Sequence, residues 1–153
     1  MINLETLNTK KITDILKENK IEYIIEDEQK DERDVEIQIK HNSEDDYSLY
    51  VKMDHGNNTL RLYGINHNIL RERRKNLEGD ELHEVINMIN IGSNVIKYST
   101  ISHIALTFEY GIPLFGKISE DHFVHALEFI IDEVAVLGNI FDEFHKIVKE
   151  MKK

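Results

Sequence analysis

Residues Ile118–Met151 read ISEDHFVHALEFIIDEVAVLGNIFDEFHKIVKEM, and this stretch decides the fold. Its large apolar residues recur in alternating steps of four and three, at Phe123, Leu127, Ile130, Val134, Leu137, Phe141, Phe144, Val148 and Met151. This spacing predicts one long helix with a continuous apolar face. Ser119 stands where its side chain can cap the first free amides of the helix. A helix so apolar along one side must pack on a sheet, on another helix or on a second subunit.

Gly138 and Asn139 lie near the middle of this predicted helix and interrupt its outer positions. The apolar face nevertheless continues through Leu137 and Phe141. Glycine costs a helix interior about 1 kcal/mol relative to alanine. We therefore predict either a kink at this point or the close approach of another backbone.

The predicted helix is long enough to favour self-association. From Phe123 to Met151 it spans about 42 Å, and strands lie only ~4.8 Å apart in a sheet. We therefore expect Phe141, Phe144 and Val148 to extend past the edge of a small sheet as an exposed apolar patch. A homodimer would bury this patch on both copies with a single interface. The alternative is that the first helix of the chain folds back and covers it.

Composition narrows the class of protein. A chain of 153 residues with 41% hydrophobic and 31% charged residues is typical of one soluble domain, and no linker or repeat divides residues 1–153. The formal charge of −10 argues against nucleic acid or an anionic membrane as the main partner. There is no cysteine, no run approaching the ~20 apolar residues of a membrane span and no recognisable signal peptide. The sequence thus predicts a cytoplasmic protein.

The first half of the chain predicts a helix followed by strands. Leu7, Ile12, Ile15 and Leu16 fall on one side of a helix that ends near residues 19–20. Apolar residues then recur as in strands at 21–26, 35–39, 47–53 and 60–65, with a charged loop at 27–34 and turns at 42–46 and 55–58. In the last strand, Tyr63 and Ile65 suggest a change of face. The simplest pairing of the last three of these strands, at 35–39, 47–53 and 60–65, is an antiparallel meander.

The second half predicts a helix and two more strands before the long helix. Residues 66–79 are polar, and their basic cluster of Arg71, Arg73, Arg74 and Lys75 is interpreted as a solvated loop or as a contact for an acidic partner segment. Asp80 is placed to cap the second helix and Gly92 to end it, and the apolar face between them consists of Leu82, Val85, Ile86 and Ile89. Strands follow at 95–99 and 103–110. The predicted fold is α+β, with helices packed on an antiparallel sheet.

Asn87 and Asn90 form a pair near the end of the second helix, three residues apart and away from Val85 and Ile89. Our hypothesis is that the pair is structural. At least one of the two side chains is expected to bond the backbone of the following loop, fixing how residues 91–95 enter the next strand.

The order helix, strands, helix, strands, long helix is similar to that of the YbjN family, which shares the type III secretion chaperone-like fold. Ile86-Asn87-Met88-Ile89-Asn90 resembles the paired asparagines of that family's middle helix, and Lys97-Tyr98 resembles the basic and aromatic residues of its next strand. Residues 104–114 are similar to its last strand and exit turn. The resemblance covers most of the chain in element order and Asp80–Leu114 in motif, without the tryptophan that the family commonly carries near the asparagines. It implies a bacterial α+β domain with a binding or regulatory role, and no known catalytic centre.

Histidine is the residue type most open to a chemical interpretation. The chain has eight histidines, and three pairs lie three residues apart, namely His122 with His125, Asp80 with His83, and Asp142 with His145. Such pairs can ligate zinc or iron from one face of a helix. A closed site needs three or four ligands, however, and no H-E-x-x-H motif occurs. We expect no metal site, no cofactor and no catalytic residue.

The sequence therefore favours a non-catalytic protein-binding module, either chaperone-like or a regulatory adaptor, with an unidentified protein partner. The alternative is a small metal-dependent enzyme that uses histidines of the last two helices. An immunity or antitoxin protein also fits the acidity and small size. Neither nucleic acid nor a membrane is expected as a partner.

Overall fold

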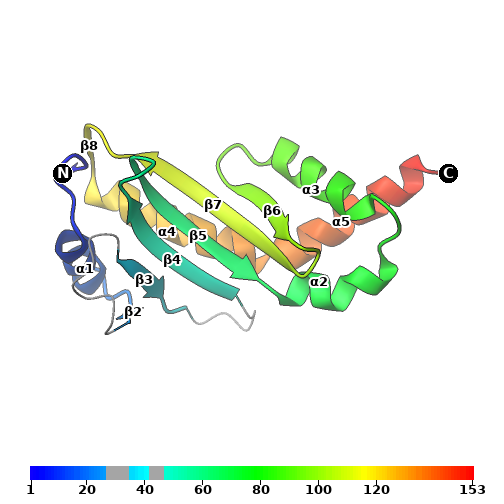
Figure 1. The fold of residues 1–153 in the computed structure, drawn as a ribbon, viewed down its shortest axis with the longest axis horizontal. Coiled ribbons are helices and arrows are strands. Elements are labelled where there is room, and N and C mark those ends of the chain that lie inside the picture. The colour runs from blue at the N-terminus through cyan, green and yellow to red at the C-terminus, as the bar shows by residue number, and fades with distance from the viewer. Residues whose placement is uncertain (27–34, 42–46) are drawn as a thin grey trace.

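The computed structural model describes residues 1–26, 35–41 and 47–153 (Figure 1). Its strands are β1 (Ile2–Asn3), β2 (Tyr23–Ile25), β3 (Glu36–Ile39), β4 (Tyr47–Asp54), β5 (Thr59–Asn66), β6 (Lys97–Ile101), β7 (Ala105–Pro113) and β8 (Lys117–Ile118). Its helices are α1 (Thr9–Glu18), α2 (Asn68–Arg73), the short 3-10 helix η2 (Arg74–Asn76), α3 (Glu81–Gly92), α4 (Glu120–Ala135) and α5 (Leu137–Met151). The predicted α+β class, with helices packed on an antiparallel sheet, is confirmed. The predicted loop at 27–34 and turn at 42–46 lie outside the described residues.

The main sheet has the strand order β2-β3-β4-β5-β7-β6, and neighbouring strands are antiparallel. Strands β3 to β5 form the predicted meander, and β2 pairs with β3 at its edge. β7 lies between β5 and β6. β1 and β8 pair separately and hold the N-terminal segment beside the start of α4. β6 is thus an edge strand, and α3 precedes it directly in the chain.

One face of the sheet is apolar and covered. Alternate residues along its strands bury their side chains toward this face, among them Ile37, Ile39, Leu49, Val51, Leu60, Leu62, Leu106 and Phe108. Figure 1 shows α4 crossing behind β4, β5 and β7, and α4 buries Phe123, Leu127, Ile130 and Val134. Among the described residues, no helix covers the opposite face in Figure 1.

The first helix matches its prediction. α1 buries Ile12, Ile15 and Leu16, and the chain leaves the helix at Asn19. Its start is fixed by Asn8, whose side-chain oxygen accepts a hydrogen bond of 2.8 Å from the backbone N–H of Lys11. Such a cap satisfies one of the free amides at a helix N-terminus.

The predicted long helix is two helices, α4 and α5, which meet at Val136. The expected kink is therefore present, although it falls two residues before Gly138. The close approach at Gly138 is made by a side chain and not by another backbone. A Cβ atom added at Gly138 would lie 3.1 Å from Nη2 of Arg73.

The prediction of an exposed apolar patch at the end of the long helix was wrong. Phe141 and Val148 are buried, at 0% and 2% exposure, and Phe144 is half-buried. α5 leaves the sheet at the break and packs against α3 (Figure 1). The apolar face of α3, made of Leu82, Val85, Ile86 and Ile89, belongs to the same buried core as these side chains, within one chain. Neither the first helix nor a second subunit is needed for this burial.

The predicted change of face in β5 was also wrong. Every second residue of β5 faces the covered side of the sheet, namely Leu60, Leu62, Gly64 and Asn66. Tyr63 and Ile65 point to the opposite side. Gly64 stands at an inward position because the ring of Phe108 crosses it. A Cβ atom there would overlap this ring and the backbone oxygen of Ser48.

The polar stretch 66–79 is not a loop but contains α2 and η2. Ile69 and Leu70 are buried and anchor α2 to the core. At the start of α3, Asp80 makes no side-chain capping bond. Instead the carboxylate of Glu81 accepts a hydrogen bond of 2.7 Å from the backbone N–H of Glu78. Gly92 is the last residue of α3 rather than the residue beyond it.

Glu81 is a nearly buried carboxylate, 3% exposed, between α3 and α5. The bond from the backbone N–H of Glu78 lowers its pKa from the ordinary value of 4.5, and His145 and Lys152 of α5 lower it further. Nε2 of His145 lies 3.3 Å from the carboxylate, and Nζ of Lys152 lies 4.0 Å from it. On α3 itself, Glu84 also faces Lys152, at 3.7 Å.

We expect the contribution of Glu81 to stability to depend on pH. A carboxylate whose pKa is lower in the folded chain stabilises it above the unfolded pKa, and this contribution disappears as pH falls through the folded pKa. Glu81→Gln should therefore be less stable than wild type above pH 4.5, and the difference should shrink in more acidic solution. Urea unfolding across this pH range measures it, with the exposed Glu84→Gln as the control. A difference independent of pH would contradict the assignment.

Candidate functional site

Three neighbouring cavities lie along β6 and the end of β7, at the edge of the sheet. Their volumes are about 560, 450 and 270 Å³. The first two share Asn94, Val95, Lys97 and Glu109, and the last two share Val95 and Tyr110. We call this surface the edge groove, lined by Asn90, Ser93, Asn94, Val95, Ile96, Lys97, Tyr98, Ser99, Thr107, Glu109, Tyr110, Gly111, His122, His125, Ala126 and Phe129.

Asn90 fixes the orientation of the β6 backbone. The backbone N–H of Tyr98 donates to Oδ1 of Asn90 at 2.7 Å, and Nδ2 of Asn90 donates to the backbone oxygen of Tyr98 at 2.8 Å. Both backbone groups of Tyr98 therefore point away from β7. Asn90 thus makes the backbone bonds expected of the asparagine pair, but its partner lies in the strand and not in the loop. Asn87 is exposed.

The free edge of β7 follows from this orientation. Along an antiparallel strand, the backbone groups of successive residues point alternately to the two sides. Phe108, opposite Tyr98, must direct its groups toward β5, so Glu109 and Gly111 direct theirs toward the β6 side. β6 begins at Lys97, opposite Glu109, and so ends short of Gly111. Among the described residues, no backbone hydrogen bond joins Gly111 to the chain before Lys97.

Gly111 is also open to solvent. It is an exposed residue, and a Cβ atom built on it would meet no atom within 4 Å. One backbone donor and one backbone acceptor of β7 are therefore presented to the groove. An unpaired strand edge of this kind is a template for another strand.

An apolar hollow lies beside this free edge, between β7 and α4. Val95 and Phe129 are 45% and 46% exposed there, and Tyr110 and Ala126 complete the apolar lining. His122 and His125 of α4 stand at the same hollow. The predicted histidine pair therefore lies at the groove, next to apolar side chains.

Tyr98 connects the groove to the core. Its ring is buried, and its hydroxyl lies 3.4 Å from Oε1 of Glu133 on α4. Burial raises the pKa of Tyr98, and the negative charge of Glu133 raises it further. The neutral hydroxyl therefore holds β6 against α4. Lys97, by contrast, is exposed at the groove.

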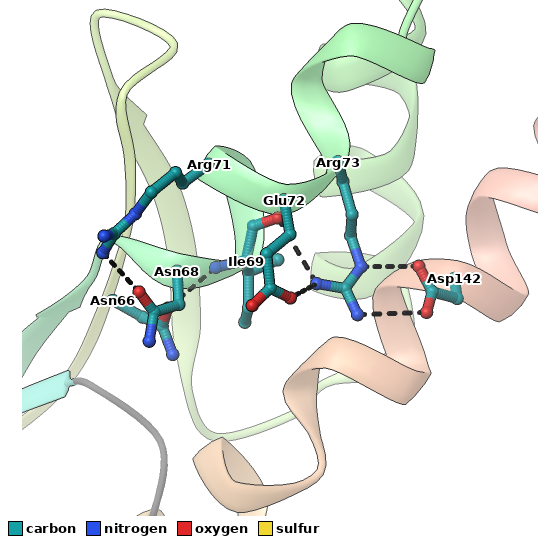
Figure 2. Close-up of polar contacts among 7 residues, drawn as sticks. All are labelled: Asn66, Asn68, Ile69, Arg71, Glu72, Arg73 and Asp142. Carbon is teal, nitrogen blue, oxygen red and sulfur yellow. Dashed lines mark hydrogen bonds and ion pairs between the residues drawn. The ribbon is translucent and has the colours of Figure 1, made fainter.

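A fourth cavity, of about 420 Å³, lies where α2 meets the junction of α4 and α5. Its polar lining includes Asn66, Asn68, Glu72, Arg73 and Asn139. Figure 2 shows that its charged groups bind one another. Nε and Nη2 of Arg73 donate to the two carboxylate oxygens of Asp142 at 2.6 and 3.1 Å, and Nη1 lies 3.3 Å from Glu72. Asn66 accepts from the backbone N–H of Ile69 at 3.1 Å. These groups stabilise the joint between α2 and α5, so the edge groove is the better candidate site.

The predicted basic cluster is divided by this arrangement. Arg73 is half-buried and bound to Asp142, and Arg71 donates to Asn68. Arg74 and Lys75 are exposed on η2. A common patch of four cations for an acidic segment is therefore not formed.

The other predicted chemical pairs have structural partners. Asp142 binds Arg73, and His145 faces Glu81. The rings of His83 and His103 meet edge to face at 5.3 Å. Within the part of the chain that the structure describes, no group of three or more His, Cys, Asp and Glu side chains is arranged to hold a metal ion.

Sequence reasoning missed Gly111, Val95 and Phe129 as groove residues. Phe129 lies off the apolar stripe of the long helix, and a large aromatic residue at such an outer position was a usable signal. Gly111 carried no signal of its own, because its free edge depends on where β6 begins.

None of the helices described is both long and apolar enough to cross a lipid bilayer. A scan of the sequence against protein-family models finds no match, and a search of curated proteins finds none either.

Proposed function

We propose that the protein is a non-catalytic protein-binding module, chaperone-like or a regulatory adaptor, which holds an extended segment of a partner protein in the edge groove. The observation that carries this proposal is the free backbone edge at Gly111 beside the apolar hollow. An extended segment can add to such an edge through its backbone and gain specificity from side-chain pockets.

The geometry of an extended strand suits this groove. A segment that continues the line of β6 beyond Lys97 would lie along β7 at Gly111. Successive side chains of a strand point to opposite faces, so alternate side chains of the segment would enter the hollow of Val95, Tyr110 and Phe129. The segment should therefore carry apolar residues at every second position.

The resemblance of Asp80–Leu114 to the YbjN family supports the same proposal. It implies a binding or regulatory role on a secretion chaperone-like fold, and this stretch supplies Asn90, Lys97, Tyr110 and Gly111 to the groove. The formal charge of −10 favours a protein over a nucleic acid as the partner. We further propose that the module works in a bacterial cytoplasm, which fractionation of the native cell would test.

Gly111→Pro should weaken segment binding while leaving the fold intact. Proline removes the free N–H and is tolerated at strand edges, because no ladder hydrogen bond is lost there. The probe is a set of peptides selected from a random phage-displayed library on the wild-type protein. Fluorescence anisotropy should show about tenfold or greater weakening with Gly111→Pro, a difference of about 1.4 kcal/mol.

Gly111→Ala is the matched control, since it keeps the N–H and its methyl group meets open space. It should bind the same peptides with nearly wild-type affinity. Bound peptide should also slow hydrogen exchange at the Gly111 amide. Selected peptides that bind Gly111→Pro as tightly as wild type, with no slowing at Gly111, would overturn the proposed site.

A further inference from the structure

The free edge of β7 is only one residue long. On the β6 side of β7, Gly111 follows the pair of Glu109 with Lys97. Pro113, the next residue to face this side, has no backbone N–H, and its oxygen accepts a hydrogen bond of 2.9 Å from the N–H of Phe115. Among the described residues of this edge, Gly111 alone therefore offers both a donor and an acceptor. A segment in the edge groove gains only two backbone bonds from β7, so it needs a further anchor.

The chain itself closes one end of this free edge. Ile96, directly before β6, is buried at 1% exposure. Its backbone oxygen accepts a hydrogen bond of 2.8 Å from Oγ of Ser93, and its N–H donates to the same atom at 3.2 Å. The backbone that enters β6 is therefore fixed. A segment that lies along Gly111 meets Ile96 end-on and cannot continue along the line of β6.

The direction of the segment follows from the single free residue. In an antiparallel pair, two residues directly opposite each other exchange both N–H···O bonds, whereas the bonds of a parallel pair are slanted. The slanted bonds of Gly111 would reach two residues of the segment, and one of these would fall at the position of Ile96. The segment therefore runs antiparallel to β7, in the direction of β6, and its C-terminal end faces Ile96 and Lys97.

Lys97 gives this end of the groove a positive charge. Its side chain is exposed and lines the cavities of about 560 and 450 Å³, the second of which contains Gly111. It has no ion-pair partner among the described residues, because Glu109, opposite it, is bound to Arg61 at 2.6 Å. A carboxylate at this end would meet the free N–H of Gly111 and the ammonium group of Lys97, and charge-assisted bonds of this kind are stronger than neutral ones.

We propose that the edge groove takes the free C-terminal tail of a partner protein, whose terminal carboxylate accepts from the N–H of Gly111 and pairs with Lys97. This inference rests on the function proposed above and narrows the extended segment to a chain terminus. The last residue of the tail pairs with Gly111, so its side chain lies on the open face of the sheet, as that of Lys97 does. The side chain before it points to the covered side, where Tyr110 and Phe129 line the hollow. The tail should therefore carry an apolar residue at its penultimate position.

Capping the carboxylate tests the proposal directly. The probes are peptides selected on the wild-type protein from a random library displayed with free C-termini, each synthesised as the free acid and as the C-terminal amide. Fluorescence anisotropy should show the amide binding about tenfold or more weakly than the acid. A short run of glycines added after the last residue should weaken binding as well, because Ile96 blocks the path of a longer chain.

Lys97→Met removes the charge and keeps an unbranched side chain. It should weaken binding of the free acid about tenfold and leave binding of the amide nearly unchanged, so that the two forms bind alike. Lys75→Met is the matched control, since it changes the net charge equally at an exposed lysine of η2. This control should keep the full preference for the free acid.

Failure of the tail and failure of the groove give different results. Acid and amide that bind wild type equally, with both weakened by Gly111→Pro and both slowing hydrogen exchange at the Gly111 amide, would overturn the tail and leave the proposed function standing. Peptides that prefer the free acid but respond to neither Gly111→Pro nor Lys97→Met would place the carboxylate elsewhere on the protein. That second result would overturn the tail and the edge groove together.

Discussion

Replacing Gly64 with alanine should lower the free energy of unfolding by about 3 kcal/mol, because the added methyl group overpacks the core. It would overlap the backbone oxygen of Ser48 as well as the ring of Phe108. The ring is itself buried at 1% exposure and has little room to move. A backbone oxygen within the sheet can move only if β4 shifts relative to β5.

Urea unfolding followed by circular dichroism measures this effect. Gly111→Ala is the matched control, since it adds the same methyl group to the adjacent strand β7 in open space. Its free energy of unfolding should stay within ~0.5 kcal/mol of the wild-type value. Equal stabilities for the two variants would show that Phe108 does not cross Gly64.

Phe141→Ala is expected to lower the free energy of unfolding by about 4 kcal/mol, as truncation of a buried phenylalanine does. Phe141 is 0% exposed and lies where α5 packs against α3. The loss should occur within the monomer, so the unfolding midpoint of the wild-type protein should not depend on its concentration. This result separates burial inside one chain from burial at a dimer interface.

Ile147→Ala serves as the control on the same helix, because Ile147 is 41% exposed. It should lower the free energy of unfolding by less than about 1 kcal/mol. A wild-type midpoint that rises with protein concentration, together with a small effect of Phe141→Ala, would instead place Phe141 at an interface between chains.

The comparison of Phe141 with Leu127 shows what the sequence can predict. Both were assigned to one apolar stripe, and both are buried. Periodicity identifies which face of a helix avoids water, but it does not identify what covers that face. Leu127 belongs to α4, beside the sheet, whereas Phe141 belongs to α5, which packs against α3. The change of partner occurs at Val136, two residues before Gly138, which predicted a kink but not which element α5 would pack against.

Gly64 shows a second limit. The alternation of apolar residues in β5 was interrupted by a residue with no side chain, so Tyr63 and Ile65 looked like a new inner face. Glycine was required there by the ring of Phe108, which comes from a strand far along the chain. Similarly, α2 is held by the ion pair of Arg73 with Asp142, at 2.6 Å between helices distant in sequence.

The candidate site was only partly predictable, for the same reason. The sequence predicts a structural role for Asn90, and its side chain does bond backbone, but at Tyr98 of β6 and not in the loop that was expected. Gly111, Val95 and Phe129 come together only through the register of β6 on β7 and the position of α4. Register and helix placement are properties of the folded chain, so no local pattern encodes them.

The position of β7 between β5 and β6 has a consequence for the order in which the protein folds. Strands β2 to β4 each pair with the next strand in the sequence. β5, by contrast, pairs with β7, so Asn66 meets Leu106 only after the intervening segment of α2, α3 and β6. Closing so long a loop costs chain entropy before its contacts are gained. The edge groove, built on β6, β7 and α4, therefore forms only after this late closure, and a nascent chain bearing just the meander has no such surface.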